Sequence, residues 1–394
     1  MIKDAQVILD NLAKDFKGNG AQKKAFDTLI EIGLPKRKSE AYKFTPITSV
    51  LEKNIDFHST GSDLFDSNQL YKEEGSHLVL INGKLSSEHS TISDQLNYKV
   101  VEVTEGKHDP FSLLNAAYAE EELTIESGYE QPIFIYHFNS NGFSNPRIKV
   151  KVKDGHTLRI VEKLITPEAV KTFTNSYIEF TVGINAFGYH TKVQNYNSAT
   201  FSHETVTATV SRDSHFYNNT FSFEGALVRN NLTINLVDEN CEGHMYGLFL
   251  LDKNSHVDNN TSVDHTKPNC YSNELYKGIL DEKATGIFNG KIYVRQDAQK
   301  TNAFQSNNNI LLSEDATLHT KPQLEIWADD VKCSHGCTSG QLDEDAIFYL
   351  RARGIDERNA KGMILNAFAG ETMGHVAVES IKEEIQALID QKLS

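Results

Sequence analysis

The spacing of hydrophobic residues changes twice along the chain. Between residue 1 and about residue 74, apolar positions recur every three or four residues, which predicts helices. One stripe comprises Ala5, Ile8, Leu9, Leu12, Ala13 and Phe16, and a second comprises Ala21, Ala25, Leu29 and Ile32. The second stripe stops at Gly33, just before Pro35, as helix ends commonly do.

From about residue 77 to residue 331, short runs of alternating apolar and polar residues predict many strands. The clearest runs are 158–161, 177–182, 205–210, 232–236 and 247–251. Small polar corners separate them at 213–214, 240–241, 254–255, 283–284, 297–298 and 315–316. The corners are unevenly spaced, at roughly one or two dozen residues, which favours a parallel β-helix over a propeller. The pattern alone does not exclude a β-sandwich.

The last part of the chain returns to helical spacing. Residues 324–327 alternate like a half-buried strand, and Cys333, His335 and Cys337 are expected on a short loop after it. Asp343 suits the start of a helix that ends at Gly354. A second helix is expected from Asp356, with one buried stripe of Ala360, Met363, Ile364, Ala367 and Phe368. These changes predict a helical domain at 1–76, a β core at 77–335 and a helical domain at 336–394.

Charge and composition restrict the class of protein. The 394 residues carry a formal net charge of −15, which argues against nucleic-acid binding because that depends on basic side chains. No apolar run is long enough for a membrane span, and the first residues predict an amphipathic helix rather than a secretory signal. Four cysteines in so long a chain do not make a disulfide framework, so we expect a cytoplasmic protein.

Cys333 and His335 are the strongest chemical candidates. A thiol and an imidazole two residues apart can face the same side of an extended chain and bind iron or zinc, but they make only half of a four-ligand site. The residues alone therefore favour a structural role. Cys270 with His265 is a minor alternative ligand pair. Most other histidines are expected at the surface or stacked between strands, with no further metal site, among them His190, His203, His215, His244 and His256.

Sequence motifs of common enzymes are missing from the chain. It contains no phosphate-binding loop of the G-x-x-x-x-G-K-[ST] type, no G-x-S-x-G turn and no G-x-G-x-x-G motif. We therefore expect no enzymatic activity, and any ATP chemistry must come from a partner.

Several segments resemble the SufB/SufD family of iron–sulfur cluster assembly proteins, and its SufD branch in particular. The most specific are D-D-V-K-C-S-H-G at 329–336 and F-Y-L-R-A-R-G-I at 348–355. Similar stretches occur at 263–265, 272–280, 288–292 and 298–312, and fainter ones at 32–46 and 80–86. Tyr42 stands where the family more often has tryptophan. The resemblance covers most of the chain and is strongest in its last third.

The resemblance implies a right-handed parallel β-helix flanked by helical domains, and a non-catalytic subunit that pairs with SufB. Ser306 stands where SufB has its cluster-building cysteine, and serine is a poor iron ligand. His335, with Cys333 second, is the implied residue at an interface where transient iron or a nascent cluster is handled, with no tightly bound cofactor. Cys337 replaces a small alanine and is expected to be a buried small side chain.

The resemblance also implies partners. SufC, an ABC-type ATPase, is expected to bind the C-terminal helices, and a homodimer is expected in isolation. Candidate ATPase contacts are Ile347, Phe348, Leu350, Ala360, Met363, Ile364, Ala367 and Phe368. Two rival interpretations are a β-helical polysaccharide lyase or hydrolase, which needs a carboxylate or calcium cluster, and a purely structural β-helix.

Overall fold

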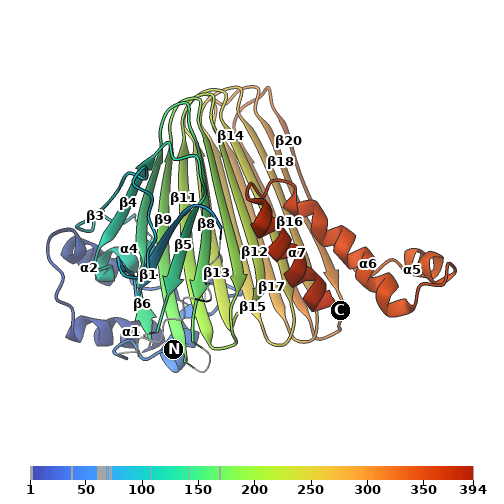
Figure 1. The fold of residues 1–394 in the computed structure, drawn as a ribbon, viewed down its shortest axis with the longest axis horizontal. Coiled ribbons are helices and arrows are strands. Elements are labelled where there is room, and N and C mark those ends of the chain that lie inside the picture. The colour runs from blue at the N-terminus through green and yellow to red at the C-terminus, as the bar shows by residue number, and fades with distance from the viewer. Residues whose placement is uncertain are drawn as a thin grey trace.

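Two long sheets, wound from one continuous chain, form the body of the protein (Figure 1). The computed structural model describes residues 3–36, 39–59, 68, 70, 73–107, 109–140, 142–167 and 170–393. Residues 1 and 2 of the first predicted helix, and residues 37 and 38 of the family-like segment at 32–46, lie outside the described residues.

The chain alternates between the two sheets. In order, the first sheet contains β2 (Lys84–Leu85), β1 (Ser76–Ile81), β5 (Ile133–Phe138), β8 (Thr157–Ile165), β10 (Phe187–Asn195), β12 (His215–Glu224), β14 (Glu242–Leu251), β16 (Tyr271–Leu280), β18 (Asn302–Leu311) and β20 (Lys332–Gly340). The second contains β19 (Thr317–Ile326), β17 (Thr285–Val294), β15 (His256–His265), β13 (Leu227–Leu236), β11 (Thr200–Val210), β9 (Thr172–Val182), β7 (Arg147–Val152), β4 (Glu122–Ser127) and β3 (Tyr98–Val101), while β6 (Phe143–Ser144) pairs with β9. The protein is therefore mainly β and forms a solenoid, as predicted, and the solenoid has about seven turns.

Parallel pairing sets the length of a turn. Phe187 pairs with His215, His215 with Glu242 and Glu242 with Tyr271, so one turn takes roughly 30 residues. Corner residues such as Asp213 (φ 57°) and Asn240 (φ 56°) adopt the left-handed conformation, which short polar side chains tolerate. The predicted corners are thus confirmed, and the five predicted strand runs lie within β8, β9, β11, β13 and β14.

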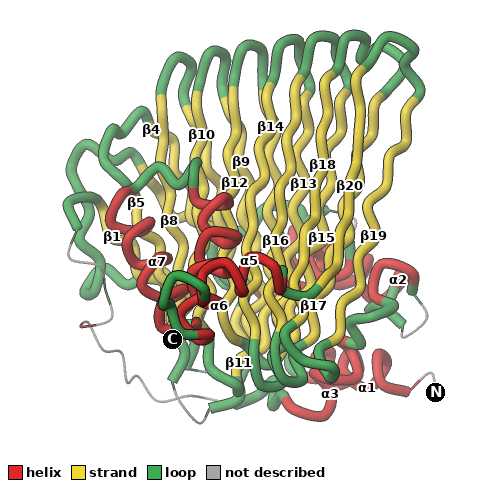
Figure 2. Tube along the Cα trace, turned by 90° about the vertical axis from the view of Figure 1, so that its right-hand side faces the viewer, coloured by secondary structure: helices red, strands yellow, loops and turns green. Residues whose placement is uncertain are grey.

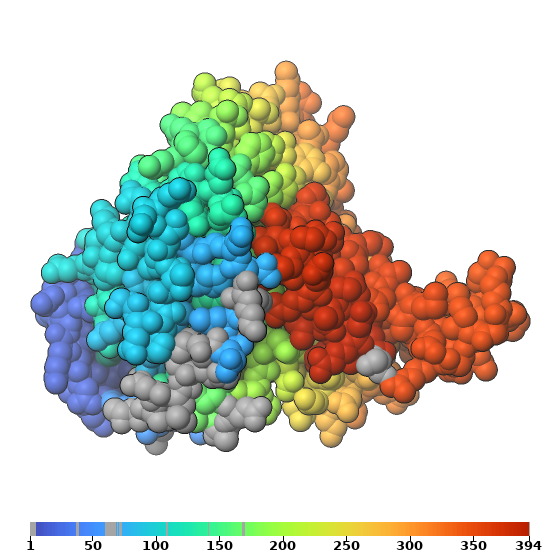
Figure 3. Space-filling view, in the orientation of Figure 1, coloured from blue at the N-terminus to red at the C-terminus, as the bar shows by residue number. Residues whose placement is uncertain are grey.

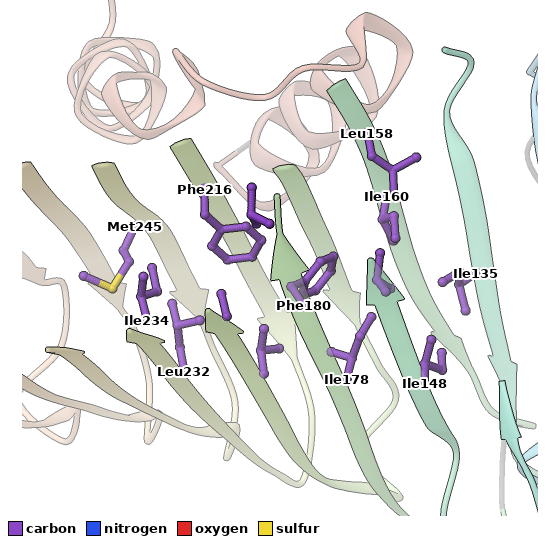
Figure 4. Packing of buried hydrophobic residues seen from close by; sticks show 14 of the residues in the cluster. Ile135, Ile148, Leu158, Ile160, Ile178, Phe180, Phe216, Leu232, Ile234 and Met245 are labelled. Carbon is purple, nitrogen blue, oxygen red and sulfur yellow. The ribbon is translucent and has the colours of Figure 1, made fainter. Parts of the chain in front are cut away.

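Alternate residues of each strand point into the solenoid. In one half of its cross-section the interior is apolar, and Figure 4 shows Ile178, Phe180, Phe216, Ile234 and Met245 packed there. The rings of Phe180 and Phe216 are 5.0 Å apart and tilted by 49°. This cluster connects the two sheets over several turns, so burial of apolar surface holds the solenoid together.

The N-terminal helices cover the outer face of the second sheet. They are α1 (Lys3–Lys14), α2 (Gly20–Ile32), the short 3-10 helix η1 (Glu40–Tyr42), α3 (Ile47–Asn54) and α4 (Pro110–Tyr118). Their apolar faces pack on Phe173, Phe201 and Leu227 of that sheet. The predicted stripes hold at Leu12 and Leu29, whereas Ala13 and Ile32 are exposed because the buried faces are narrower than the apolar pattern.

The C-terminal helices cover the outer face of the first sheet, so the two helical groups lie on different sides of the strands (Figure 2). They are α5 (Glu344–Arg351), α6 (Glu357–Gly370), the 3-10 helix η3 (Glu371–Met373) and α7 (Glu379–Leu393). Ile381, Ile385 and Ile389 of α7 are fully buried in the cluster that contains Phe221 and Leu248 of the sheet. By contrast, α5 and the adjoining end of α6 project away from the body as an arm (Figures 1 and 3).

Helix caps follow the sequence closely. The Asp343 side chain accepts hydrogen bonds from the amides of Asp345 and Ala346, and Asp356 accepts one from Asn359. Gly354, with φ 87°, follows α5 as predicted. The strand β20 runs to Gly340 and so crosses the predicted boundary between residues 335 and 336. Among the described residues, no helix is both long enough and apolar enough to cross a membrane.

Candidate functional site

The segment that carries Cys333, His335 and Cys337 is a strand, β20, so the prediction of a short loop was wrong. Its backbone continues the first sheet, and the three residues pair with Ala303, Gln305 and Asn307 of β18. The sequence C-S-H-G-C-T-S-G has no apolar alternation, and only the ladder offered by β18 makes it a strand.

All three side chains belong to the inward face of the sheet. Their partners Ala303, Gln305 and Asn307 are buried inside the solenoid, and alternate strand residues share a face. No described strand continues the first sheet beyond β20, and β19 ends the second sheet in the same way. We call this the open end of the solenoid: the strands β19 and β20 with their inward-facing side chains. His335 is exposed there.

The two thiols at the open end differ. Cys333 is half-buried against Ile292, Val294 and Ala303, and this burial raises the pKa of its thiol. Cys337 is exposed, with its Sγ 3.4 Å from Thr320 Oγ1 across the solenoid, so the expectation of a buried side chain was wrong. The last turn lacks the covering rung that would bury it.

These three residues do not form a closed metal site on their own. Neighbouring inward positions on one strand are roughly 6–7 Å apart, and the three ligand atoms are not among the described groups that lie within 4.8 Å of one another. The set supplies one imidazole and two thiols in a row. Such side chains can bind a metal together with ligands from a second molecule at this end, or exchange protons with that molecule.

A polar column that the sequence pattern does not reveal runs inward from His335. Gln305 pairs with His335 in register, and its Nε2 donates to Glu274 Oε2 at 2.6 Å. The Thr261 hydroxyl donates to the other oxygen of Glu274. Burial raises the pKa of Glu274 to about 7. In the sequence, Gln305 and Glu274 are polar residues within strands that alternate in polarity. The sequence does not tell which alternate positions point into the solenoid, and the structure does.

Further along the axis, buried charges are paired. Glu162 lies 3.4 Å from His137 Nε2 and 3.1 Å from His190 Nε2. Lys192 Nζ lies 2.9 Å from Glu204 Oε2. All of these groups except His190 line a cavity of about 10 Å³, the space of one water molecule. The cavity therefore leaves no room for a ligand larger than water, although both ring nitrogens of His137 have no hydrogen-bond partner among the described residues.

Two other sequence candidates are placed differently. Ser306 belongs to the outward face of β18, opposite to the face of His335. His265 and Cys270 are both buried and lie within hydrogen-bonding reach of each other; contact with Cys241 first, and with His265, lowers the pKa of the Cys270 thiol. His265 Nε2 also pairs with Ser272 Oγ at 2.8 Å, and Cys270 Sγ donates to the Asp238 carbonyl.

The predicted buried stripe of α6 is wrong in part. Its buried residues are Ala360, Leu365 and Ala369, whereas Met363 is 52% exposed and Ala367 is exposed. Ile364 and Phe368 are half-buried, and Lys277 Nζ lies 4.2 Å from the Phe368 ring centre. The prediction failed because α6 has apolar residues around most of its circumference, and only contact with α7 and the sheet selects the buried face.

On α5 the candidate residues separate by exposure. Ile347 is buried at 3% exposure and Leu350 is half-buried, while Phe348 is 73% and Tyr349 55% exposed. Phe348, Tyr349 and Met363 are therefore the large exposed apolar residues of α5 and α6. Ile347 and Ala360 hold the arm together and cannot reach a partner.

Comparison with known proteins identifies the family of this chain. Residues 135–368 match the family described as SUF system FeS cluster assembly, SufBD core domain. The iron–sulfur cluster assembly protein SufD of Escherichia coli is 30% identical over 387 residues, covering 93% of this chain and 90% of that protein. A SufBD-family assembly protein of Synechocystis is 29% identical and covers 93% of this chain and 89% of its own length. The chloroplastic protein ABCI7 of Arabidopsis thaliana is 26% identical, covering 91% and 82%. The chain belongs to the SufBD family of iron–sulfur cluster assembly proteins and is SufD-like.

Proposed function

We propose that this chain is the non-catalytic subunit of a cytoplasmic iron–sulfur assembly scaffold and that it pairs with a SufB-like subunit through its open end. The observation that carries the proposal is the uncovered last turn, where the inward-facing side chain of His335 is exposed at the open end, beside the unpaired edges of β19 and β20. Family membership favours this function over the polysaccharide lyase.

The two edges differ in what they offer a partner. Unpaired strand edges present backbone donors and acceptors that another chain can pair with. Pro322 lies in β19 opposite Gly290 and has no N–H, so that edge lacks one donor. Because β20 contains no proline, it is the better template, and it also carries His335. In the absence of SufB, two copies would pair through the same end and form a homodimer.

His335 would act on iron as cargo rather than as a resident cofactor. Its exposed imidazole can complete a site whose other ligands come from the partner. Cys333 is the weaker candidate, because burial raises the pKa of its thiol and disfavours the thiolate that binds metals.

The arm is the proposed docking surface for a SufC-like ATPase. Phe348, Tyr349 and Met363 are exposed there, and large exposed apolar side chains mark interaction surfaces. ATP hydrolysis by that partner would then move the arm, while this chain contributes no catalytic group.

The test is co-expression of the tagged chain with SufB- and SufC-like proteins, followed by anaerobic reconstitution with iron and sulfide. We expect His335→Ala to keep the complex but to lower cluster formation severalfold. Ser334→Ala, on the opposite face of the same strand, should change neither property. A chain that purifies alone, or a His335→Ala variant that forms clusters normally, would contradict the proposed role.

Arm docking is tested separately. Phe348→Asp should release the ATPase while the SufB-like subunit stays bound, because the two surfaces are distinct. Lys361→Ala, which removes an ion pair with Glu357 on the same arm, is the matched control and should retain both partners.

A further inference from the structure

Two histidines and a glutamate gather on the outer face of the first sheet, away from the open end. His215 begins β12 and Glu242 begins β14, and the two residues are register partners. His244 lies two residues after Glu242 and therefore on the same face. No metal site is predicted among these histidines from the sequence, where most are expected at the surface or stacked between strands.

The distances suit a shared ion. His215 Nδ1 lies 3.1 Å from Glu242 Oε2, and His244 Nε2 lies 2.8 Å from the same oxygen. All three ligand atoms lie within 4.8 Å of one another. Ligands of a metal ion at about 2.1 Å are roughly 3.0–3.4 Å apart, so small rotations of these side chains would complete the geometry.

Hydrogen bonding does not fully explain the cluster. His215 Nδ1 is buried and has no hydrogen-bond partner among the described residues, although Glu242 Oε2 is only 3.1 Å away. The oxygen therefore lies off the direction in which this nitrogen would donate a proton. His244 Nε2 does form a hydrogen bond with this oxygen at 2.8 Å, so a metal ion would displace the proton shared there, whereas His215 Nδ1 has its lone pair or proton unused.

Aromatic stacking holds the imidazoles in place. Phe187 stacks on His215 with ring centres 4.6 Å apart, and Tyr217 stacks on His244 at 4.3 Å. His375, on the segment between η3 and α7, lies 6.1 Å from the His244 ring. Because stacking already holds these rings on two neighbouring strands, the side chains lose little conformational entropy when an ion binds.

The site is accessible from solvent. The side chains of His215 and Glu242 are 24% and 33% exposed, so an ion can enter without rearrangement of the sheet.

We propose that His215, Glu242 and His244 bind a divalent first-row transition-metal ion such as Zn²⁺, Co²⁺ or Fe²⁺. Two imidazoles and one carboxylate favour these ions over Mg²⁺ and Ca²⁺, which prefer oxygen ligands. Three protein ligands leave at least one position for water or for a ligand from another molecule. This inference does not depend on the proposed assembly function.

The test is titration of the chelator-treated full chain with Zn²⁺ by calorimetry, and with Co²⁺ by absorption spectroscopy. We expect one ion per chain at this site, unaffected by millimolar Mg²⁺. His215→Asn and Glu242→Gln should each weaken binding by about tenfold or more. These replacements are chosen because Glu242→Gln keeps the side-chain shape and both residues are only partly buried.

The open end is the competing site, since it also contains a histidine and two thiols. A Cys333→Ser/His335→Ala/Cys337→Ser variant should retain binding, and the Co²⁺ spectrum should lack the thiolate-to-metal band that cysteine ligands produce. Circular dichroism spectra must match between variants. Binding lost only in the open-end variant, or no binding by the wild-type chain at micromolar ion, overturns the proposal.

Discussion

The two ends of the solenoid are built in opposite ways. At the first turns, β2 pairs antiparallel with β1 and β3 pairs antiparallel with β4, and Leu85 and Leu96 pack against the interior. At the last turn, β19 and β20 have no such cover. Natural sheets usually protect an edge that has no partner, so the contrast is what makes the open end the proposed place for a second molecule to bind.

Removal of a buried ion pair near the closed end should give the largest effect. Glu122 in β4 lies 2.8 Å from Arg147 Nε in β7, and both residues are 1% exposed. Glu122→Ala should lower the free energy of unfolding by about 3–5 kcal/mol, because it leaves a buried guanidinium unpaired. Glu325→Ala breaks the partly exposed Lys291 pair near the open end and should cost less than about 1 kcal/mol. Urea denaturation measures the free energy of unfolding of both variants. Equal losses would contradict the proposed difference between the closed and the open end.

Apolar truncation should show the same difference on a smaller scale. Ile125 in β4 is fully buried, so Ile125→Ala should cost about 2–5 kcal/mol. Leu324 in β19 is half-buried, and Leu324→Ala should cost about 1 kcal/mol. Binding of a partner at the open end should increase the cost of the second change only, which chemical denaturation of the complex would reveal.

The interior near the open end should make stability depend on pH. Folding raises the pKa of Glu274 to about 7, so the folded state binds the proton more tightly than the unfolded state does. The stability that this proton contributes is present below about pH 4.5 and is lost as pH rises through 7. His203, under the N-terminal helices, has the opposite shift, because burial and Arg229 lower its pKa; its contribution is lost below about pH 6.5.

Glu274→Gln separates these two effects. Relative to the wild type, the variant should gain up to about 3 kcal/mol between pH 5 and pH 8, since it has no carboxyl to ionise. Unfolding midpoints across this range measure the gain. A difference between the two proteins that does not change with pH would show that Glu274 has an ordinary pKa.

The smallest expected effect is spectroscopic. Trp327, the single tryptophan, follows β19 at the open end and is 50% exposed, with its ring stacked 6.4 Å from Tyr293. Pairing through this end should shift its emission to the blue, and dilution of a homodimer should reverse the shift. Emission that stays constant when the SufB-like partner binds would place the interface elsewhere.

The sequence predicted what depends on local chemistry. Corner residues such as Asp213, the cap Asp343 and the strand runs follow from backbone preferences that neighbouring residues reveal. It failed at β20 and at α6, where a strand without apolar residues and a helix with too many take their structure from distant contacts. Glu274 and the pair of His215 with Glu242 were missed for a related reason, because register between turns decides which residues meet.

The parallel ladder also determines how the molecule would come apart. Each strand of the later turns exchanges hydrogen bonds only with the same strand of the turn before and of the turn after. Tension applied at β20 would therefore unfold the solenoid one turn at a time from the open end, while the earlier turns stayed folded. A partner that pairs with the last turn would block unfolding from this end, and assembly would then protect all the turns of the solenoid.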